Sequence, residues 1–133
     1  MKYFLDTNIC VYYLKGRNEN LKRKLLKEHP DNIKIPSIVK AELLYGAEKS
    51  KYKKDNIIKI NEFLLPFEII PFSDLETDRY AKTRATLESK GKTIGPNDLI
   101  IASIVMEHDG ILITNNINEF ERIKEMKIEN WME

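Results

Sequence analysis

The sequence contains one cysteine, two histidines and no long apolar run, and each shortage excludes a class of protein. Cys10 has no partner for a disulfide within the chain, and we expect it to be a buried apolar residue in a reducing cytosol. His29 and His108 lack the spacing of zinc ligands and are expected at the surface. No apolar stretch approaches the ~20 residues that cross a bilayer. These absences predict a cytoplasmic protein without disulfides, zinc or a membrane span.

Several motifs of common enzymes are also missing. There is no Walker A loop, no Gly-x-Gly-x-x-Gly dinucleotide fingerprint and no Gly-x-Ser-x-Gly nucleophile elbow. The 22 basic and 21 acidic residues give a formal net charge of +1, so bulk charge does not indicate a protein that coats nucleic acid. Basic residues gather in the stretches 15–27 and 49–59, which we interpret as solvated helix faces, with a binding patch as the alternative.

The pattern of apolar residues predicts an α/β protein. Short apolar segments predict strands at residues 2–5, 33–35, 67–70 and 111–114. Helical spacing predicts helices between them, at residues 9–14, 18–28, 36–48, 53–65, 73–91 and 95–106. Because strands alternate with helices, we expect a central parallel sheet flanked by helices. With 133 residues and no repeat or linker, the chain is expected to form a single domain over residues 1–133.

Several acidic residues occupy positions that favour chemistry. Asp6 directly follows the strand at 2–5, and Glu119 comes shortly after the strand at 111–114. Glu42 lies inside an apolar helix, and Asp98 lies in the first turn of another. In parallel α/β sheets, sites form beyond the carboxyl ends of the strands. We therefore expect these carboxylates to approach one another at one edge of the sheet.

Each acid also has a simpler explanation. Asp6 suits a helix N-cap, Asp98 a first-turn acid that favours the helix dipole, and Glu42 an exposed helix position. As a group, however, the carboxylates would repel one another, and a hard divalent cation relieves that repulsion. Magnesium prefers oxygen ligands and keeps several waters, so two or three carboxylates suffice. Such an ion activates water and offsets charge on a phosphodiester.

Four segments in order resemble PIN-domain proteins and, more narrowly, VapC-type toxins of bacterial and archaeal toxin–antitoxin pairs. They are Leu5-Asp6-Thr7-Asn8, Lys40-Ala41-Glu42-Leu43-Leu44-Tyr45-Gly46, Gly95-Pro96-Asn97-Asp98-Leu99-Ile100-Ile101-Ala102, and Leu112-Ile113-Thr114-Asn115-Asn116 with Glu119-Phe120. The resemblance covers almost the whole chain. It implies a PIN-like three-layer sandwich, a Mg²⁺ or Mn²⁺ cofactor and endoribonuclease activity on RNA, with transfer RNA expected and messenger RNA as the alternative. It also implies a cognate VapB-type antitoxin and a homodimer.

The same resemblance assigns roles to particular residues. Asp6, Glu42 and Asp98 match three acids of the family's cluster, with Asp6 and Asp98 as the metal ligands. Many PIN proteins have an aspartate where this chain has Asn116, so the fourth position is either Asn116 or Glu119, one helical turn further on. The number of metal ions, one or two, depends on which. Four polar residues are expected to hydrogen-bond the carboxylates, namely Thr7, Asn8, Thr114 and Asn116.

Two other functions fit part of the pattern. A phosphatase of the haloacid-dehalogenase kind also has an aspartate after its first strand, but its second aspartate would stand where this chain has Asn8. A catalytically silent binding module would use the acids only for hydrogen bonds or a basic peptide, and the intact acidic set argues against it. The abundant apolar residues of segment 36–65 indicate packing between two helices, and the resemblance to VapC-type toxins implies that part of this surface is a groove for an antitoxin helix.

Overall fold

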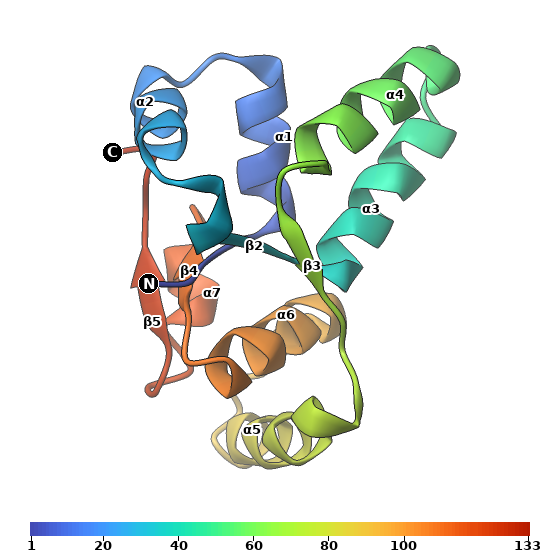
Figure 1. Ribbon diagram of the computed structural model, residues 1–133. Helices are drawn as coiled ribbons and strands as arrows, with labels where there is room; N and C mark the ends of the chain where they lie inside the picture. Colours follow the sequence, from blue (N-terminus) through green and yellow to red (C-terminus); the bar gives the residue numbers. More distant parts are fainter.

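The computed structural model describes residues 1–133 and contains one sheet of five parallel strands (Figure 1). The strands are β1 (Tyr3–Leu5), β2 (Ile33–Pro36), β3 (Glu68–Ile70), β4 (Ile111–Ile113) and β5 (Lys127–Glu129), in the spatial order β3-β2-β1-β4-β5. The four predicted strands are confirmed. Strand β5 was not predicted, because Lys127 and Glu129 are exposed and three residues give no apolar run.

Helices form a layer on each side of the sheet. They are α1 (Thr7–Lys15), α2 (Glu19–Lys27), α3 (Ser37–Glu48), α4 (Lys53–Leu64), α5 (Thr77–Ser89), α6 (Pro96–Glu107) and the short α7 (Ile117–Phe120). Helices α1 to α4 lie on one side of the sheet, and α5 and α6 lie on the other (Figure 1). This division follows from the connections, because right-handed crossovers change face when the chain turns back from β3 to β4. The expected three-layer α/β architecture is confirmed.

The core is one cluster of 27 buried apolar side chains, and α6 is its most buried helix. Leu99 and all residues from 101 to 105 are buried, which explains why the sequence of α6 is apolar on nearly every side. Helix α6 packs against α5 on its outer side and reaches the sheet on its inner side. No helix of the chain combines the length and the apolar character that a membrane crossing requires.

A tight turn sets β4 beside β1. Asp109 adopts a positive φ of 51°, and a Cβ atom at Gly110 would lie 2.4 Å from the ring of Phe4. Only glycine permits this approach, because any Cβ atom at position 110 would collide with the ring of Phe4. The glycine thus allows the short turn that joins α6 to β4. Strand β1 therefore has β2 on one side and β4 on the other. The chain runs outward from β1 through β2 to β3 and then returns to β4, so the strand order reverses beside β1. Ligands of open α/β sheets bind at such a switch point.

Candidate active site

The four acids singled out by sequence meet at the carboxyl edge of the sheet. Asp6 follows β1, Glu42 lies in α3, Asp98 lies in the first turn of α6, and Glu119 lies in α7. The negative charges of the other three all act on the carboxyl group of Asp98. Residues that are distant in sequence therefore form one cluster at the switch point.

Asp6 is the buried member of this carboxylate cluster, with 5% of its surface exposed. Its Oδ1 accepts a hydrogen bond of 2.9 Å from the backbone N–H of Ile9, so Asp6 is also the N-cap of α1. Its Oδ2 accepts a hydrogen bond from the hydroxyl of Thr114, which follows β4. Burial raises the pKa of Asp6 to about 6, with a smaller contribution from the charge of Glu42 and against the effect of both hydrogen bonds.

Glu42 is held from two other helices. The hydroxyl of Thr7 in α1 donates to its Oε1 at 2.5 Å, and the side-chain amide of Asn97 in α6 donates to its Oε2 at 3.3 Å. Asn97 was not among the residues predicted for the site, although its position directly before Asp98 places it near the carboxylates. These hydrogen bonds fix a half-buried carboxylate at the junction of three helices.

Asp98 and Glu119 form a pair of neighbouring carboxyl groups: a Cβ atom at Gly95 would lie 3.6 Å from Oδ2 of Asp98 and 3.7 Å from Oε1 of Glu119. Burial, followed by the proximity and charge of Glu119, raises the pKa of Asp98 to about 7. Burial acts on Glu119 too, but hydrogen bonds to it outweigh that effect and lower its pKa. Two of them come from the backbone N–H of Gly95 at 2.9 Å and the side-chain amide of Asn116 at 3.0 Å. Crowding of negative charge therefore favours the protonated form of Asp98 in the ion-free protein.

The polar residues expected around the carboxylates divide into two groups. Thr7, Thr114 and Asn116 each donate a side-chain hydrogen bond to one of the four acids. Asn116 thus contacts Glu119 rather than replacing it, and its backbone N–H also donates to the Thr114 hydroxyl at 2.9 Å. The expectation for Asn8 is not met, because its side chain is exposed in the first turn of α1 and hydrogen-bonds none of the four acids.

The charge of the cluster is not balanced by any ion pair. Every ion pair of the protein lies elsewhere. Arg122 is the one cation whose charge acts on Glu119. The atoms of the cluster that could bind a metal ion are all carboxylate oxygens, and such a set of ligands fits a hard divalent cation and not zinc. No three of the side chains form a ready cage for an ion. Magnesium needs no such cage, since one or two carboxylates and several waters hold it.

Comparison with known proteins gives consistent matches over almost the whole chain. Residues 3–126 match the family model of the PIN domain. The chain is 47% identical over 132 residues to ribonuclease VapC2 of Rickettsia felis, covering 98% of both proteins. It is 34% identical over 131 residues to the tRNA(fMet)-specific endonuclease VapC of Salmonella typhimurium, again covering 98% of both.

Solved structures agree with the sequence comparison. The fold matches a chain in the crystal structure of VapBC2 from Rickettsia felis bound to a DNA fragment from their promoter, with a TM-score of 0.92 and 46% identity. That match covers 98% of this chain and 99% of the other. The crystal structure of DNA-bound VapBC from Salmonella typhimurium matches with a TM-score of 0.93 and 33% identity, covering 98% of both chains.

Proposed function

The chain belongs to the PIN-domain family, and we propose that it is a VapC-type endoribonuclease that acts as the toxin of a toxin–antitoxin pair. The observation that carries this proposal is the meeting of four carboxylates at the switch point of the sheet, with no basic side chain paired to them. A single sheet and a single buried cluster support one domain over residues 1–133. We expect it to act in the cytoplasm, where RNA is translated.

Asp6 and Asp98 are the proposed ligands of a Mg²⁺ or Mn²⁺ ion. They contribute only oxygen donors, and the crowding of negative charge around Asp98 favours a divalent cation there. When bound, the ion supplies Lewis-acid chemistry that activates water and offsets negative charge on a phosphodiester. The chemistry of the donor set supports Mg²⁺ and Mn²⁺ equally.

The remaining carboxylates have positioning and proton-handling roles. Glu42 is fixed at both oxygens, by Thr7 and Asn97, so it is suited to orienting the water that attacks phosphorus. Glu119 is likewise fixed at both oxygens, by Gly95 and Asn116, and lies beside Asp98. A carboxylate held in this way keeps its orientation when substrate arrives, which is the preorganisation that hydrolysis needs.

The test of this function is the cleavage of RNA. Transfer RNA is the first substrate to try, since the Salmonella relative is named for it, and messenger RNA is the second. Asp6→Asn and Asp98→Asn are expected to lower the cleavage rate by about 100-fold or more, and EDTA should do the same to the wild type. Asp31→Asn, at an exposed acid outside the cluster, is the matched control and should cut like the wild type. Equal cleavage by all variants, or by the chelated protein, would refute the mechanism.

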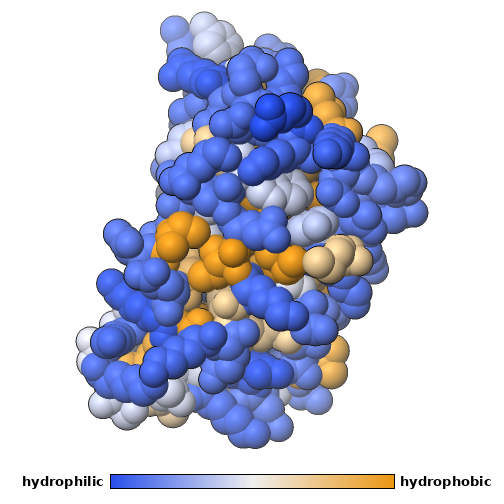
Figure 2. Space-filling view, turned by 90° about the vertical axis from the view of Figure 1, so that its left-hand side faces the viewer, coloured by the Kyte–Doolittle hydropathy of each residue, from blue (hydrophilic) through white to orange (hydrophobic).

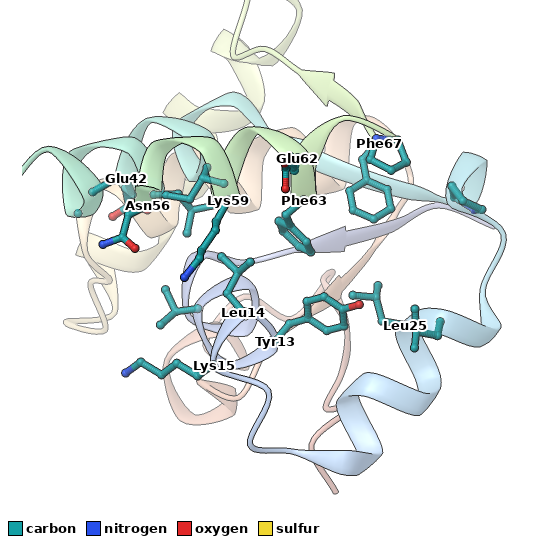
Figure 3. Close-up of a pocket in the computed structure, with 18 of the residues that line it drawn as sticks. Tyr13, Leu14, Lys15, Leu25, Glu42, Asn56, Lys59, Glu62, Phe63 and Phe67 are labelled. Carbon is teal, nitrogen blue, oxygen red and sulfur yellow. The ribbon is translucent and has the colours of Figure 1, made fainter. Parts of the chain in front are cut away.

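A groove of about 960 Å³ beside the site is the proposed seat of the antitoxin. It lies between α1 and α2 on one side and α3 and α4 on the other, and more than half of its 19 lining residues are hydrophobic. Figure 3 shows Tyr13, Phe63 and Phe67 around this space, with Glu42 at one end beside Asn56. A segment that fills the groove therefore reaches a catalytic carboxylate and blocks it.

Apolar character and continuity with the active site support a VapB-type antitoxin segment as the occupant. Solved relatives are described as VapBC complexes. We also propose a homodimer, because Tyr45, Tyr52, Ile58 and Leu65 are exposed around α3 and α4. Sedimentation of the isolated chain tests that assembly.

A further inference from the structure

A second concave surface lies on the other side of the sheet, between α5 and the segment that follows α7. This surface, here called the α5 cleft, has a volume of about 460 Å³. Only Leu87 and Ile123 among its lining residues are hydrophobic. Figure 2 shows the side of the molecule that carries β5, and residues at the height of α5 are mainly hydrophilic there. The α5 cleft is therefore unsuited to an apolar peptide or ligand.

The α5 cleft is rich in basic side chains without ion-pair partners. Its cations are Arg79, Lys82, Lys90, Arg122 and Lys124, and its acids are Asp78, Glu107 and Glu125. Arg79 is neutralised by Glu107, to which it donates a hydrogen bond of 3.3 Å. None of the three lysines forms an ion pair. The charge that remains is positive and free to bind an anion.

This positive charge is greatest at the end of the cleft nearest the carboxylate cluster. Asp78 stands in the first turn of α5 and Glu107 in the last turn of the antiparallel α6, so both mark the far end. Glu125 also lines a separate hollow with Gly110, which directly precedes β4. Glu125 therefore lies toward the amino ends of the strands, away from the carboxylate cluster. Lys90, by contrast, caps the carboxyl end of α5, which leads into the loop before α6.

Arg122 connects this basic end to the active site. Its Nη1 donates a hydrogen bond of 2.6 Å to the backbone carbonyl of Thr93, and two residues later the N–H of Gly95 donates to Glu119. The loop that carries Thr93 and Gly95 is therefore bound at two points: to Arg122 in the α5 cleft and to Glu119 in the carboxylate cluster. A chain that leaves the catalytic carboxylates along this loop passes directly into the α5 cleft.

We propose that the α5 cleft binds the sugar–phosphate backbone of the RNA next to the scissile bond. The inference rests on the proposed ribonuclease function and names the surface that holds the substrate. A net charge of +1 and an acidic active site give RNA little overall attraction, so local cations must supply it. Thr83 and Thr86 add hydroxyl donors, and the absence of aromatic side chains from the lining indicates backbone contacts and not base stacking.

The test compares two triple variants with the same loss of charge. The cleft variant carries Lys82→Gln, Lys90→Gln and Lys124→Gln, all at exposed positions. The control variant carries Lys22→Gln, Lys27→Gln and Lys54→Gln, from the two basic stretches of the sequence, also exposed. Glutamine preserves helix propensity, and circular dichroism checks that both variants fold. Each triple is also placed in an Asp98→Asn background, so that transfer RNA is bound without being cut.

Fluorescence anisotropy with labelled transfer RNA measures binding at several salt concentrations. The cleft variant is expected to lose roughly tenfold or more in affinity. The magnitude of the slope of log K against log salt should fall by roughly two to three, because fewer counterions are released when three phosphate contacts are lost. The control variant should bind like its parent. An equal loss in both variants, or none in the cleft variant, would overturn the proposal.

Cleavage separates this inference from the proposed function. With the catalytic site intact, the cleft variant should cut transfer RNA with a raised KM and an unchanged kcat, and should cut a dinucleotide like the wild type. A wild type that cuts no RNA contradicts the proposed function, while the anisotropy experiment still decides on the cleft. Unchanged RNA affinity combined with weakened binding of an antitoxin would assign the cleft to a protein and refute the RNA proposal.

Discussion

Asp98 lies beside Glu119, and no lysine, arginine or histidine forms an ion pair with either residue. Two carboxyl groups remain this close only when one is protonated or a cation neutralises them. Burial and the neighbouring acids raise the pKa of Asp98 to about 7. At neutral pH the ion-free cluster therefore holds unfavourable electrostatic energy, which protons, a divalent cation or a neutral substitution relieves.

Asp98→Asn is therefore expected to stabilise the ion-free protein while it inactivates the enzyme. The neutral amide removes the repulsion, and its N–H₂ group can donate a hydrogen bond to Glu119. Because Asp98 is partly solvated, we expect a gain of only about 1 kcal/mol in the free energy of unfolding at pH 8. Urea unfolding in EDTA measures it. Asp31→Asn, outside the cluster, should leave stability unchanged, and destabilisation by Asp98→Asn would contradict the account.

The stability of the ion-free protein should fall as pH rises through neutrality. The folded-state pKa values of Asp6 and Asp98, about 6 and about 7, lie above the ordinary value of 3.8. The folded protein thus binds protons that the unfolded chain has released, and this stabilisation is full below pH 3.8 and lost as pH rises through the folded values. Glu119 contributes with the opposite sign, because its pKa is lowered from the ordinary value of 4.5. Its stabilisation is present above pH 4.5 and is lost only as the pH falls below that value, outside the neutral range.

Thermal unfolding between pH 5 and pH 8 in EDTA tests this expectation. The midpoint should decline over roughly that interval, and Mg²⁺ should restore it at pH 8 but have little effect at pH 5, where protons compete for the carboxylates. A double variant with Asp6→Asn and Asp98→Asn isolates the two groups and should show a flatter profile. An equal decline in the double variant would show that other groups cause it.

Asn97→Ala is expected to lower kcat roughly tenfold with little change in stability, because it frees one oxygen of Glu42. Asn97 is exposed, so no buried cavity forms. A double-mutant cycle with Glu42→Gln distinguishes positioning from an independent role. If Asn97 acts through Glu42, its removal should have almost no further effect in the Glu42→Gln background. Fully additive losses would show that Asn97 acts on the substrate by itself.

The positions of the acids could be predicted, but their hydrogen-bond partners only in part. Asp6 and Asp98 carry local signals, since one ends an apolar strand and the other opens an apolar helix. The bond between Asn97 and Glu42 depends on the packing of α3 against α6, which no local pattern contains. The predicted hydrogen bond from Asn8 to the carboxylates does not form, because nearness to Asp6 in sequence does not determine where the side chain points.

The fold shows the same limit at its edges. The apolar strands in the centre were predictable, whereas β5 has one half-buried residue, Ile128, between two exposed ones. It forms because the free edge of β4 offers hydrogen-bonding groups to any nearby extended chain. The start of α5 is another example. Ser73 caps a single 3₁₀ turn, and the α-helix begins only at Thr77, because a cap signal does not specify which kind of turn follows.

Gly46 offers a way to separate antitoxin binding from catalysis. It lies in α3 and lines the apolar groove, and a Cβ atom there would meet no atom within 4 Å apart from its chain neighbours and the backbone of its own helix. Gly46→Phe should therefore place a large side chain in the groove without strain in the helix. We expect RNA cleavage to remain near the wild-type rate while affinity for the cognate antitoxin falls about 100-fold, since the ring occupies the space that the antitoxin segment needs.

Gly46→Ala is the matched control for the backbone change. Alanine is a better helix former than glycine, so this variant should gain about 0.5–1 kcal/mol of stability, and its methyl group leaves the groove open. Antitoxin binding, measured by calorimetry, should then be close to that of the wild type. If Gly46→Phe binds the antitoxin as tightly as Gly46→Ala does, the partner docks elsewhere. If Gly46→Phe also stops cleavage while the protein stays folded, the groove belongs to the substrate path and not to the antitoxin alone.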